Sequence, residues 1–426
     1  MHRGPLGFVY IVDPGFRATR QIALGCQDRS IPFELYTSFI FNDRGAIAQA
    51  TGALPRSMSQ SVRRLLMRRH LPDLSTSHVT SQVWPETFRR VASTFPRGVR
   101  PNDLELYRYQ DRLFEFFAAR HMPAEAAVVY CTEGVALRVL ERASQLGAFA
   151  MLEGTVHPDH LVSVLRPEYE RLGLDFGGAF SDNWNRTKLE FSASDLIITQ
   201  SEFAAGTFIS HGIDRDKVLV VPLGVDLDTF YPDQRIERQS GRMKVLYVGS
   251  LSVRKGLPRL MEALSSVGGS FIELTVVGVL DDALAGYCRQ QFKRLGERVR
   301  WIPGLSRREL VSLYREADVV VLPSICDSFG QSVLEAMACG TAVLVTDACG
   351  VSVTNGHDGV VVPAGDSEAL AAALEAMASS DRRLLTDLGQ SGAATARAHG
   401  WSVYRLKMTD AIVSELVAGR DASAHI

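Results

Sequence analysis

The stretch ADVVVLPSICDSFGQSVLEAMACGTAVLVTD, residues 317–347, decides the fold of this chain. Its apolar run VVVL predicts a buried strand, and the apolar spacing that follows predicts a helix from about residue 330 to Ala338. The dipeptide Cys339-Gly340 provides the C-terminal stop of that helix, and GTAVLVTD begins another strand. Strand, loop, helix and strand in this order predict a parallel sheet covered by helices.

The same alternation of strand and helix signals extends on both sides of this stretch. Residues 243–264, MKVLYVGSLSVRKGLPRLMEAL, predict strand, loop and helix. Toward the N-terminus the alternation runs from FVYIV near residue 8 to DLIITQSEF near residue 200, with a buried strand from Ala126 to Tyr130. The strands are rich in Val, Ile and Leu, which is typical of a parallel sheet with helices on both faces. The middle, about 45 to 122, is rich in Arg and aromatic residues and reads as helical.

One internal similarity suggests two related halves. SASDLIITQS (192–201) resembles READVVVLPS (315–324), and in each an Asp precedes a buried strand that ends at a Ser. With the alternation, this predicts an α/β protein of two Rossmann-like domains that face each other across a cleft, where ligands bind beyond the carboxyl ends of the strands. Chance similarity of two α/β strands is the alternative. The change from apolar to polar residues at 222–241 predicts the domain boundary.

The composition of the chain limits the kinds of partner that it is expected to bind. The formal net charge is −2 and 22% of residues are charged, which gives no reason to expect a nucleic-acid partner. From Arg56 to Arg120, however, the chain has twelve Arg, no Lys and six Asp or Glu. That region is either a solvated helical surface or a patch for an anionic acceptor or a membrane. Its segment RSMSQSVRRLLMRRHL (56–71) suits an anionic membrane or a plain amphipathic helix.

The cysteines and the apolar runs point to a cytoplasmic protein. Six scattered Cys residues without a C-x-x-C pair fit a reducing compartment and give no zinc-ligand spacing. The first apolar run is more typical of a strand than of a signal peptide, and no run approaches the roughly 18 residues of a membrane-spanning helix. We expect a cytoplasmic location, with peripheral contact at the inner membrane face as the second option.

Two cations follow a predicted strand in GSLSVRKGLPRL, residues 249–260. Arg254 and Lys255 come just before a helix that has Pro258 in its first turn. Free backbone N–H groups at a helix start attract anions, and the two cations add charge, so a diphosphate suits this place. The alternative is a surface Arg-Lys pair on a loop.

Two carboxylates lie eight positions apart at the end of the deciding strand. Asp327 falls in the predicted loop, and Glu335 lies about a turn into the predicted helix. A carboxylate accepts two hydroxyl hydrogen bonds, which suits the vicinal diol of a ribose or a sugar. The alternative is that Asp327 caps the helix and that Glu335 is an exposed surface residue.

These stretches, together with SEFAAGTFISHGIDRDKVLVVPLGVDLDTFYP (201–232), resemble the retaining glycosyltransferases of family four, which have the GT-B fold. The resemblance is dense from about 149 to 415. It implies an N-terminal acceptor-binding domain at 1–222, a linker at 223–240, a nucleotide-sugar-binding domain at 241–397, and a last helix at 398–426 that crosses back to the N-terminal domain.

The resemblance also assigns roles to single positions. It implies that Glu335 holds the ribose, Asp327 contacts the transferred sugar, and Lys255 binds the diphosphate. The family has Glu where this chain has the shorter Asp327, and often Arg where it has Ser250, so Arg254 is the candidate replacement. The full donor-binding set is Gly249, Ser250, Arg254, Lys255, Trp301, Ile302, Pro303, Ser328, Phe329, Gly330, Gln331, Ser332 and Glu335.

In the N-terminal half, LEGTVHPDHL (152–161) is similar to a family segment with a catalytic His. His157 fits that position, His160 is a nearby competitor, and Glu153 is a weaker candidate for the same site. Gly15 matches the first strand-to-helix turn, where family members often have a Gly-rich loop. The catalytic set implied by the resemblance is therefore His157, Asp327, Lys255 and Arg254.

The predicted activity is retaining transfer of a sugar from a nucleoside-diphosphate sugar to a hydroxyl of a carbohydrate, lipid-linked or small-molecule acceptor. The nucleotide sugar is the co-substrate, and neither a cofactor nor a metal is expected, since Arg254 and Lys255 stabilise the departing diphosphate. The alternatives are another GT-B enzyme such as an epimerase or a phosphorylase, and a non-catalytic partner subunit. A nicotinamide-dependent oxidoreductase is disfavoured because no G-x-G-x-x-G follows a strand.

Overall fold

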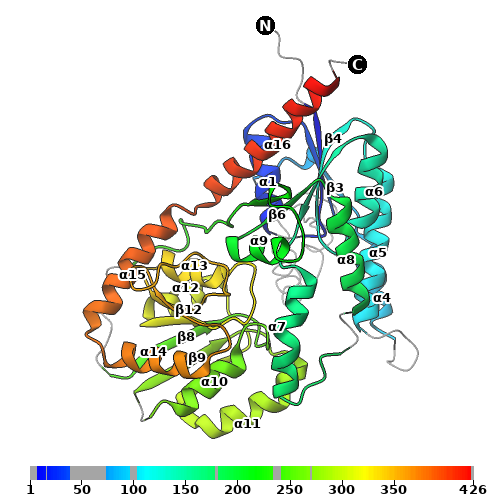
Figure 1. The fold of residues 1–426 in the computed structure, drawn as a ribbon. Helices are drawn as coiled ribbons and strands as arrows, with labels where there is room; N and C mark the ends of the chain where they lie inside the picture. The colour runs from blue at the N-terminus through cyan, green and yellow to red at the C-terminus, as the bar shows by residue number, and fades with distance from the viewer. Residues whose placement is uncertain are drawn as a thin grey trace, which may run out of the picture. The chain divides into compact units, whose positions relative to one another are not determined.

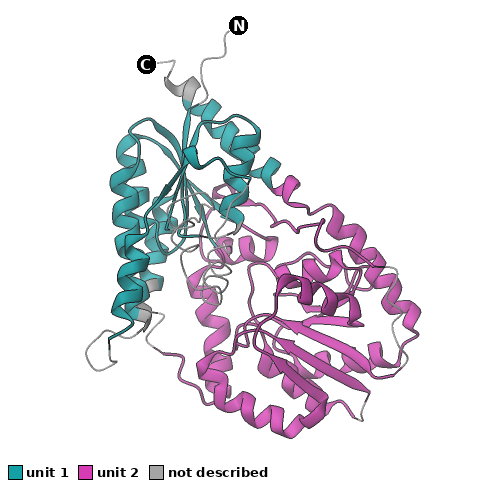
Figure 2. Cartoon of the chain, turned by 180° about the vertical axis from the view of Figure 1, so that it is seen from behind, with its two compact units in different colours: residues 1–154, 178–198, 405–426 teal, residues 155–177, 199–404 magenta. Residues whose placement is uncertain are grey.

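The computed structural model describes the chain in seven stretches and divides it into two compact units (Figures 1 and 2). Unit 1 comprises residues 1–154, 178–198 and 405–426, and unit 2 comprises residues 155–177 and 199–404. The described stretches are 7–15, 17–38, 73–95, 103–177, 181–233, 241–268 and 271–423. The Arg-rich segment 56–71 lies outside them.

The first sheet has seven strands in the order β3-β2-β1-β4-β5-β6-β7, and its pairs from β3 to β6 are parallel. The predicted strand FVYIV is β1, and the strand predicted from Ala126 to Tyr130 continues to Thr132 as β4. The strands are β1 (Phe8–Val12), β2 (Phe33–Thr37), β3 (Val79–Ser81), β4 (Ala126–Thr132), β5 (Phe149–Glu153), β6 (Leu196–Thr199) and β7 (Val218–Val220).

The last helix, α16 (Trp401–Ser423), contacts the first helix, α1 (Arg17–Asp28). Arg405 Nη1 lies 3.2 Å from an Asp28 carboxylate oxygen, and Arg29 donates to Thr409 Oγ1 at 2.9 Å. The other helices of unit 1 are α4 (Trp84–Ala92), α5 (Asp103–His121), α6 (Leu137–Leu146), α8 (Ser181–Ala193) and the short η1 (Thr76–His78).

The second sheet has six parallel strands in the order β10-β9-β8-β11-β12-β13. Its order reverses between β8 and β11, which is the point where open α/β sheets bind ligands. The strands are β8 (Met243–Val248), β9 (Ile272–Val277), β10 (Val299–Ile302), β11 (Val319–Leu322), β12 (Ala342–Thr346) and β13 (Val360–Val362).

Helices α10 and α11 lie on one side of this sheet, and α12 and α13 lie on the other (Figure 1). The predicted helix of the deciding stretch is confirmed as α13, and Gly340 beyond it has φ +74°, a conformation that favours glycine. The helices are α10 (Leu257–Ser266), α11 (Ala285–Leu295), α12 (Arg307–Glu316), α13 (Gln331–Ala338), α14 (Ser367–Ser379), α15 (Arg382–Arg397), α7 (Pro158–Arg171) and α9 (Glu202–Ile209), with the short η2 (Arg215–Lys217), η3 (Asp282–Leu284) and η4 (Gly296–Arg298).

The two similar segments form the same local structure in both sheets. The Asp195 amide donates to the Ala150 carbonyl at 2.9 Å, and the Asp195 carboxylate accepts the Ala150 amide at 2.8 Å. Asp318 makes the same two bonds with Lys244, at 2.9 and 2.8 Å. In each sheet this Asp ties the start of a strand to its neighbour, so the internal similarity has a physical basis.

Two segments before residue 222, the predicted end of the N-terminal domain, pack with unit 2. Residues 155–177, with α7, and residues 199–222, with α9, belong to unit 2. In the part of the chain that the structure describes, no helix is both long and apolar enough to span a membrane.

Candidate functional site

All predicted donor residues except Trp301, Ile302 and Pro303 follow β8 or β11, the two strands that flank the reversal of the second sheet. Gly249 follows β8, and its amide donates to the Val277 carbonyl of β9 at 3.0 Å. The loop then runs to Gly256, which has φ +70° and begins α10. A Cβ at Gly256 would lie 1.7 Å from the Pro323 carbonyl oxygen behind β11, so only glycine lets the two loops approach.

The two predicted cations, Arg254 and Lys255, both contact the carboxylate of Asp327. Its side chain is 4% exposed, Arg254 Nη1 lies 3.0 Å from one carboxylate oxygen, and Lys255 Nζ forms an ion pair with the other. Two cations therefore face one anion, which leaves one positive charge that can attract a further anion. The alternative, in which Asp327 caps α13, is wrong, because the N-cap residue of α13 is Gly330 and the helix has no side-chain cap.

Backbone hydrogen bonds hold this ion-paired loop. The Ile325 amide donates to the Arg254 carbonyl at 2.9 Å, and the Asp327 amide donates to the Ala348 carbonyl at 2.9 Å. At Gly350, with φ +76°, a Cβ would lie 2.3 Å from the Ser328 carbonyl oxygen. The sequence signalled the cations and the carboxylate separately, but not these ion pairs, since the pairing depends on the order of the strands.

Glu335 is buried on α13 and not exposed, so the surface alternative is wrong. The Tyr314 hydroxyl of α12 donates to Glu335 Oε2 at 3.1 Å. Burial, followed by the nearby Glu335 carboxylate, raises the pKa of Tyr314 well above its usual value, so this hydroxyl stays a donor. No sequence signal pointed to Tyr314.

The loop between Asp327 and α13 contacts residues that precede the second sheet in sequence. The Ser201 hydroxyl donates to the Ser328 carbonyl at 2.7 Å, and Gln331 Nε2 donates to the Gly224 carbonyl at 2.9 Å. Phe329 is buried, whereas Ser332 is half-buried. These contacts fix the backbone that the family resemblance assigns to sugar hydroxyls.

The predicted nucleobase residues lie on and just after the edge strand β10, two strands away from β8 in the sheet. Trp301 on β10 is 39% exposed, which leaves part of its ring open for stacking, and its Nε1 donates to the Gly278 carbonyl at 3.0 Å. The Ile302 carbonyl accepts the Gly278 amide at 3.0 Å, and Pro303 follows. Ser250 lies in the β8 loop, with its hydroxyl 3.2 Å from that of Ser252.

His157 belongs to unit 2, with the donor candidates, and is the N-cap residue of α7. Its ring is buried and stacks on His211 with centroids 4.5 Å apart. Nδ1 accepts the Asp159 amide at 3.3 Å, which places the proton of the neutral ring on Nε2. Burial, and then His211, lowers the pKa of the competing His160.

Gly15 and Glu153 belong to unit 1 and therefore stay predictions as parts of one site with the residues of unit 2. The Gly15 amide donates to Asp13 Oδ1 at 2.8 Å in the turn behind β1. The Tyr130 hydroxyl donates to the Glu153 carboxylate at the end of β5.

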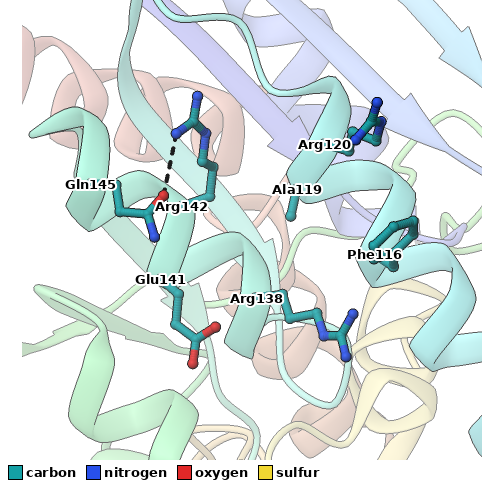
Figure 3. A pocket seen from close by; sticks show the side chains of 7 residues that line it. All are labelled: Phe116, Ala119, Arg120, Arg138, Glu141, Arg142 and Gln145. Atoms are coloured by element: carbon teal, nitrogen blue, oxygen red, sulfur yellow. Dashed lines mark hydrogen bonds between the residues drawn. The ribbon is translucent and has the colours of Figure 1, made fainter.

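Two cavities lie away from the predicted donor residues. One, of about 770 Å³, lies between α5 and α6 of unit 1, where Arg120, Arg138 and Arg142 surround it beside Phe116 (Figure 3). The other, of about 660 Å³, is lined by α15 and the C-terminal end of α13. Neither contains a predicted site residue, so they do not define the donor site. The described residues hold no group of three or more His, Cys, Asp or Glu arranged for a metal.

Comparison with solved structures defines the fold class. Sucrose-phosphate synthase from Thermosynechococcus elongatus matches with a TM-score of 0.68 at 18% identity over 97% of this chain and 100% of that one. HepE from Anabaena, solved in complex with UDP and glucose, matches with a TM-score of 0.63 at 18% identity over 96% and 100%. The chain has the GT-B fold, as predicted.

Comparison of sequences then shows a match to one family in the C-terminal half of the chain. Residues 232–395 match the model of the glycosyl transferases group 1, the family that the resemblance predicted. The D-inositol 3-phosphate glycosyltransferase of Pseudarthrobacter chlorophenolicus is 32% identical over 224 residues, 49% of this chain and 53% of that protein. The enzyme of the same name from Mycolicibacterium smegmatis is 32% identical over 194 residues, 41% and 43%. The chain thus spans about half the length of these curated relatives.

Proposed function

We propose that this protein is a retaining, metal-independent glycosyltransferase that moves a sugar from a nucleoside-diphosphate sugar to an acceptor hydroxyl. One observation carries the proposal: Lys255 and Arg254 meet the Asp327 carboxylate at the reversal point of the second sheet, inside the group 1 family segment. HepE, which shares the fold, was solved with UDP-glucose, so a uridine nucleotide is the first donor to test.

We assign a task to each of these groups. A donor diphosphate draws Arg254 and Lys255 partly away from Asp327, and the two cations offset the charge that builds up on the departing nucleoside diphosphate. Asp327, freed on one side, then accepts hydroxyls of the transferred sugar. Glu335, aligned by the Tyr314 hydroxyl, accepts the ribose diol.

His157 supplies a donor to the same reaction. The accepting role of its Nδ1 leaves an Nε2–H, which suits a hydrogen bond to an oxygen of the sugar or of the acceptor. The acceptor is a carbohydrate, lipid-linked or small-molecule hydroxyl. We place the reaction in the cytoplasm, with segment 56–71 as the part of the chain to test for contact with an anionic membrane.

A thermal-shift screen against nucleoside diphosphates and their sugars tests the donor site. At least one pair should raise the melting temperature, Glu335→Ala should abolish the shift, and Lys255→Ala should weaken it. The exposed residues Glu375 and Lys293 provide matched controls, whose Ala variants should shift like the unmodified chain. A chain that no nucleotide stabilises would contradict the proposal.

Turnover assays test the reaction. Nucleoside diphosphate should be released when an acceptor hydroxyl is present and in the presence of a chelator. NMR should show the same anomeric configuration in donor and product. Nucleotide release that does not depend on an acceptor points to an epimerase instead.

A further inference from the structure

Helix α7, which begins after His157, packs in the core of unit 2. Leu165 and Tyr169 are buried in that core, and the Tyr169 ring meets the Phe176 ring at a centroid distance of 5.2 Å. By sequence, α7 follows the fifth strand of the first sheet, so its membership of unit 2 requires specific contacts with the second sheet's helices.

One of these contacts is a partly buried ion pair between α7 and α10. The Glu168 carboxylate of α7 contacts the Arg259 guanidinium of α10 at two points. Arg259 Nε lies 3.0 Å from Glu168 Oε2, and Arg259 Nη2 forms an ion pair with Glu168 Oε1. The Glu168 side chain is 10% exposed and that of Arg259 is 20% exposed. A bidentate pair of this kind fixes orientation as well as distance.

Neighbouring charges complete the network. Arg171 of α7 lies 3.0 Å from Glu168 Oε2 and forms a second ion pair with Glu262 of α10. The Ser367 hydroxyl of α14 donates to Glu262 at 2.8 Å. Two residues of α7 are therefore bound to two residues of α10 through alternating charges.

The network connects the helices that carry two predicted catalytic groups. His157 is the N-cap residue of α7, and α10 begins at Leu257, two positions after Lys255. We propose that the Glu168–Arg259 pair is a positioning device that sets His157 relative to Lys255 and so aligns the reacting groups with the donor. This inference rests on the proposed function. It makes α7, which has His157 as its N-cap residue, part of the unit that contains the predicted donor residues.

The test compares two variants on one helix. Glu168→Gln keeps the shape and removes the charge, whereas Glu170→Gln changes an exposed carboxylate of α7. Because small misplacements of reacting groups are costly, Glu168→Gln should lower kcat about tenfold and leave the donor KM within about twofold. Glu170→Gln should change neither. Arg259→Lys, which keeps a charge, should retain more of kcat than Arg259→Gln.

Two outcomes would overturn the inference. One is a Glu168→Gln variant with a lower melting temperature but an unchanged kcat, which makes the pair purely structural. The other is hydrogen exchange of the α7 amides that Glu168→Gln does not accelerate. The exchange readout needs no turnover, so it still decides whether the pair holds α7 if the unmodified protein shows no transfer and the proposed function fails.

Discussion

Helix α6 in unit 1 and helix α10 in unit 2 both follow a central strand of a parallel sheet, but different charged groups surround their N-terminal ends. At α6, the buried Glu190 carboxylate of α8 accepts the amides of Gly134 at 2.7 Å, Ala136 at 3.1 Å and Leu137 at 3.3 Å. Glu115 of α5 accepts the next amide, that of Arg138, at 2.8 Å. The protein thus supplies its own anions to this helix start.

At α10, the N-cap residue is Gly256, which has no side chain to accept a helix amide, and among the described residues no carboxylate from another element accepts the first amides of the helix. Arg254 and Lys255 precede it and share Asp327. The same strand–loop–helix arrangement therefore has its helix amides bound by carboxylates of the protein in unit 1. In unit 2 it carries excess positive charge. In the proposed function, the anion-binding chemistry of this fold therefore contributes to stability in unit 1 and binds the donor diphosphate in unit 2.

Removing the negative charge of Asp327 sharpens the comparison most. Asp327→Asn leaves both cations without their carboxylate, so a nucleoside diphosphate should bind several-fold more tightly by calorimetry. Turnover with the nucleotide sugar should fall about 100-fold, or about 2.7 kcal/mol, because the sugar loses its charged acceptor.

Asp327→Glu is the control, since it keeps the charge and adds one methylene. It should keep diphosphate affinity near that of the unmodified chain and retain more activity than Asp327→Asn. Weaker diphosphate binding by Asp327→Asn would show that Asp327 orders the cations for the ligand and does not compete with it.

A substitution at the carboxylate that binds the first amides of α6 should lower the stability of the protein and leave donor binding unchanged. Glu190→Gln places an amide NH₂ where a carboxylate oxygen now accepts a backbone N–H, so the free energy of unfolding should fall by about 2–3 kcal/mol. Urea unfolding measures this loss, with the exposed Glu141→Gln as control. A nucleotide shift that disappears in Glu190→Gln would mean that this start is part of the donor site.

The acidic cluster at α6 also predicts a pH dependence. Burial, opposed by Arg112 and Arg89 and reinforced by Glu115 and Glu190, raises the pKa of Asp111 from 3.8 to about 7. The stability that this raised pKa contributes is present below pH 4 and is lost as the pH rises through 7.

Asp111→Asn should therefore raise the free energy of unfolding at pH 8 by about 1–2 kcal/mol and change it little at pH 4. Urea titrations at the two pH values measure the difference, and Asp387→Asn on the exposed face of α15 is the control. An equal effect at both pH values would contradict the raised pKa.

The fold was predictable because the signals that specify it are local. Apolar runs and helix stops gave β11 and α13, and glycine and proline placement gave the start of α10. The resemblance supplied the roles that we propose for Asp327 and Glu335. What the sequence did not reveal depends on contacts between distant residues: the ion pairs of Asp327, the burial of Glu335 and the packing of α7 in unit 2.

The same limit explains why the sequence does not predict the role of Glu190. In the sequence it is one acid in an amphipathic helix, and nothing local distinguishes it from an exposed neighbour. Its role appears only when α8 packs beside the start of α6, 53 to 56 positions away along the chain. The sequence does point to Asp195 and Asp318, because their segments repeat and a repeat is a sequence signal even when its contacts are long-range.

The smallest expected effect concerns a neutral hydrogen bond to a donor carboxylate. Tyr314→Phe removes the hydroxyl that lies 3.1 Å from Glu335 Oε2 and leaves the packing of the ring in place. Since Glu335 is proposed to bind the ribose equally in the ground state and the transition state, the donor KM should rise about fivefold, or about 1 kcal/mol, at unchanged kcat. Tyr231→Phe, at an exposed ring, is the matched control. A fall in kcat at constant KM would instead place Glu335 among the groups that act only in the transition state, and the two carboxylates would then have exchanged the roles proposed for them.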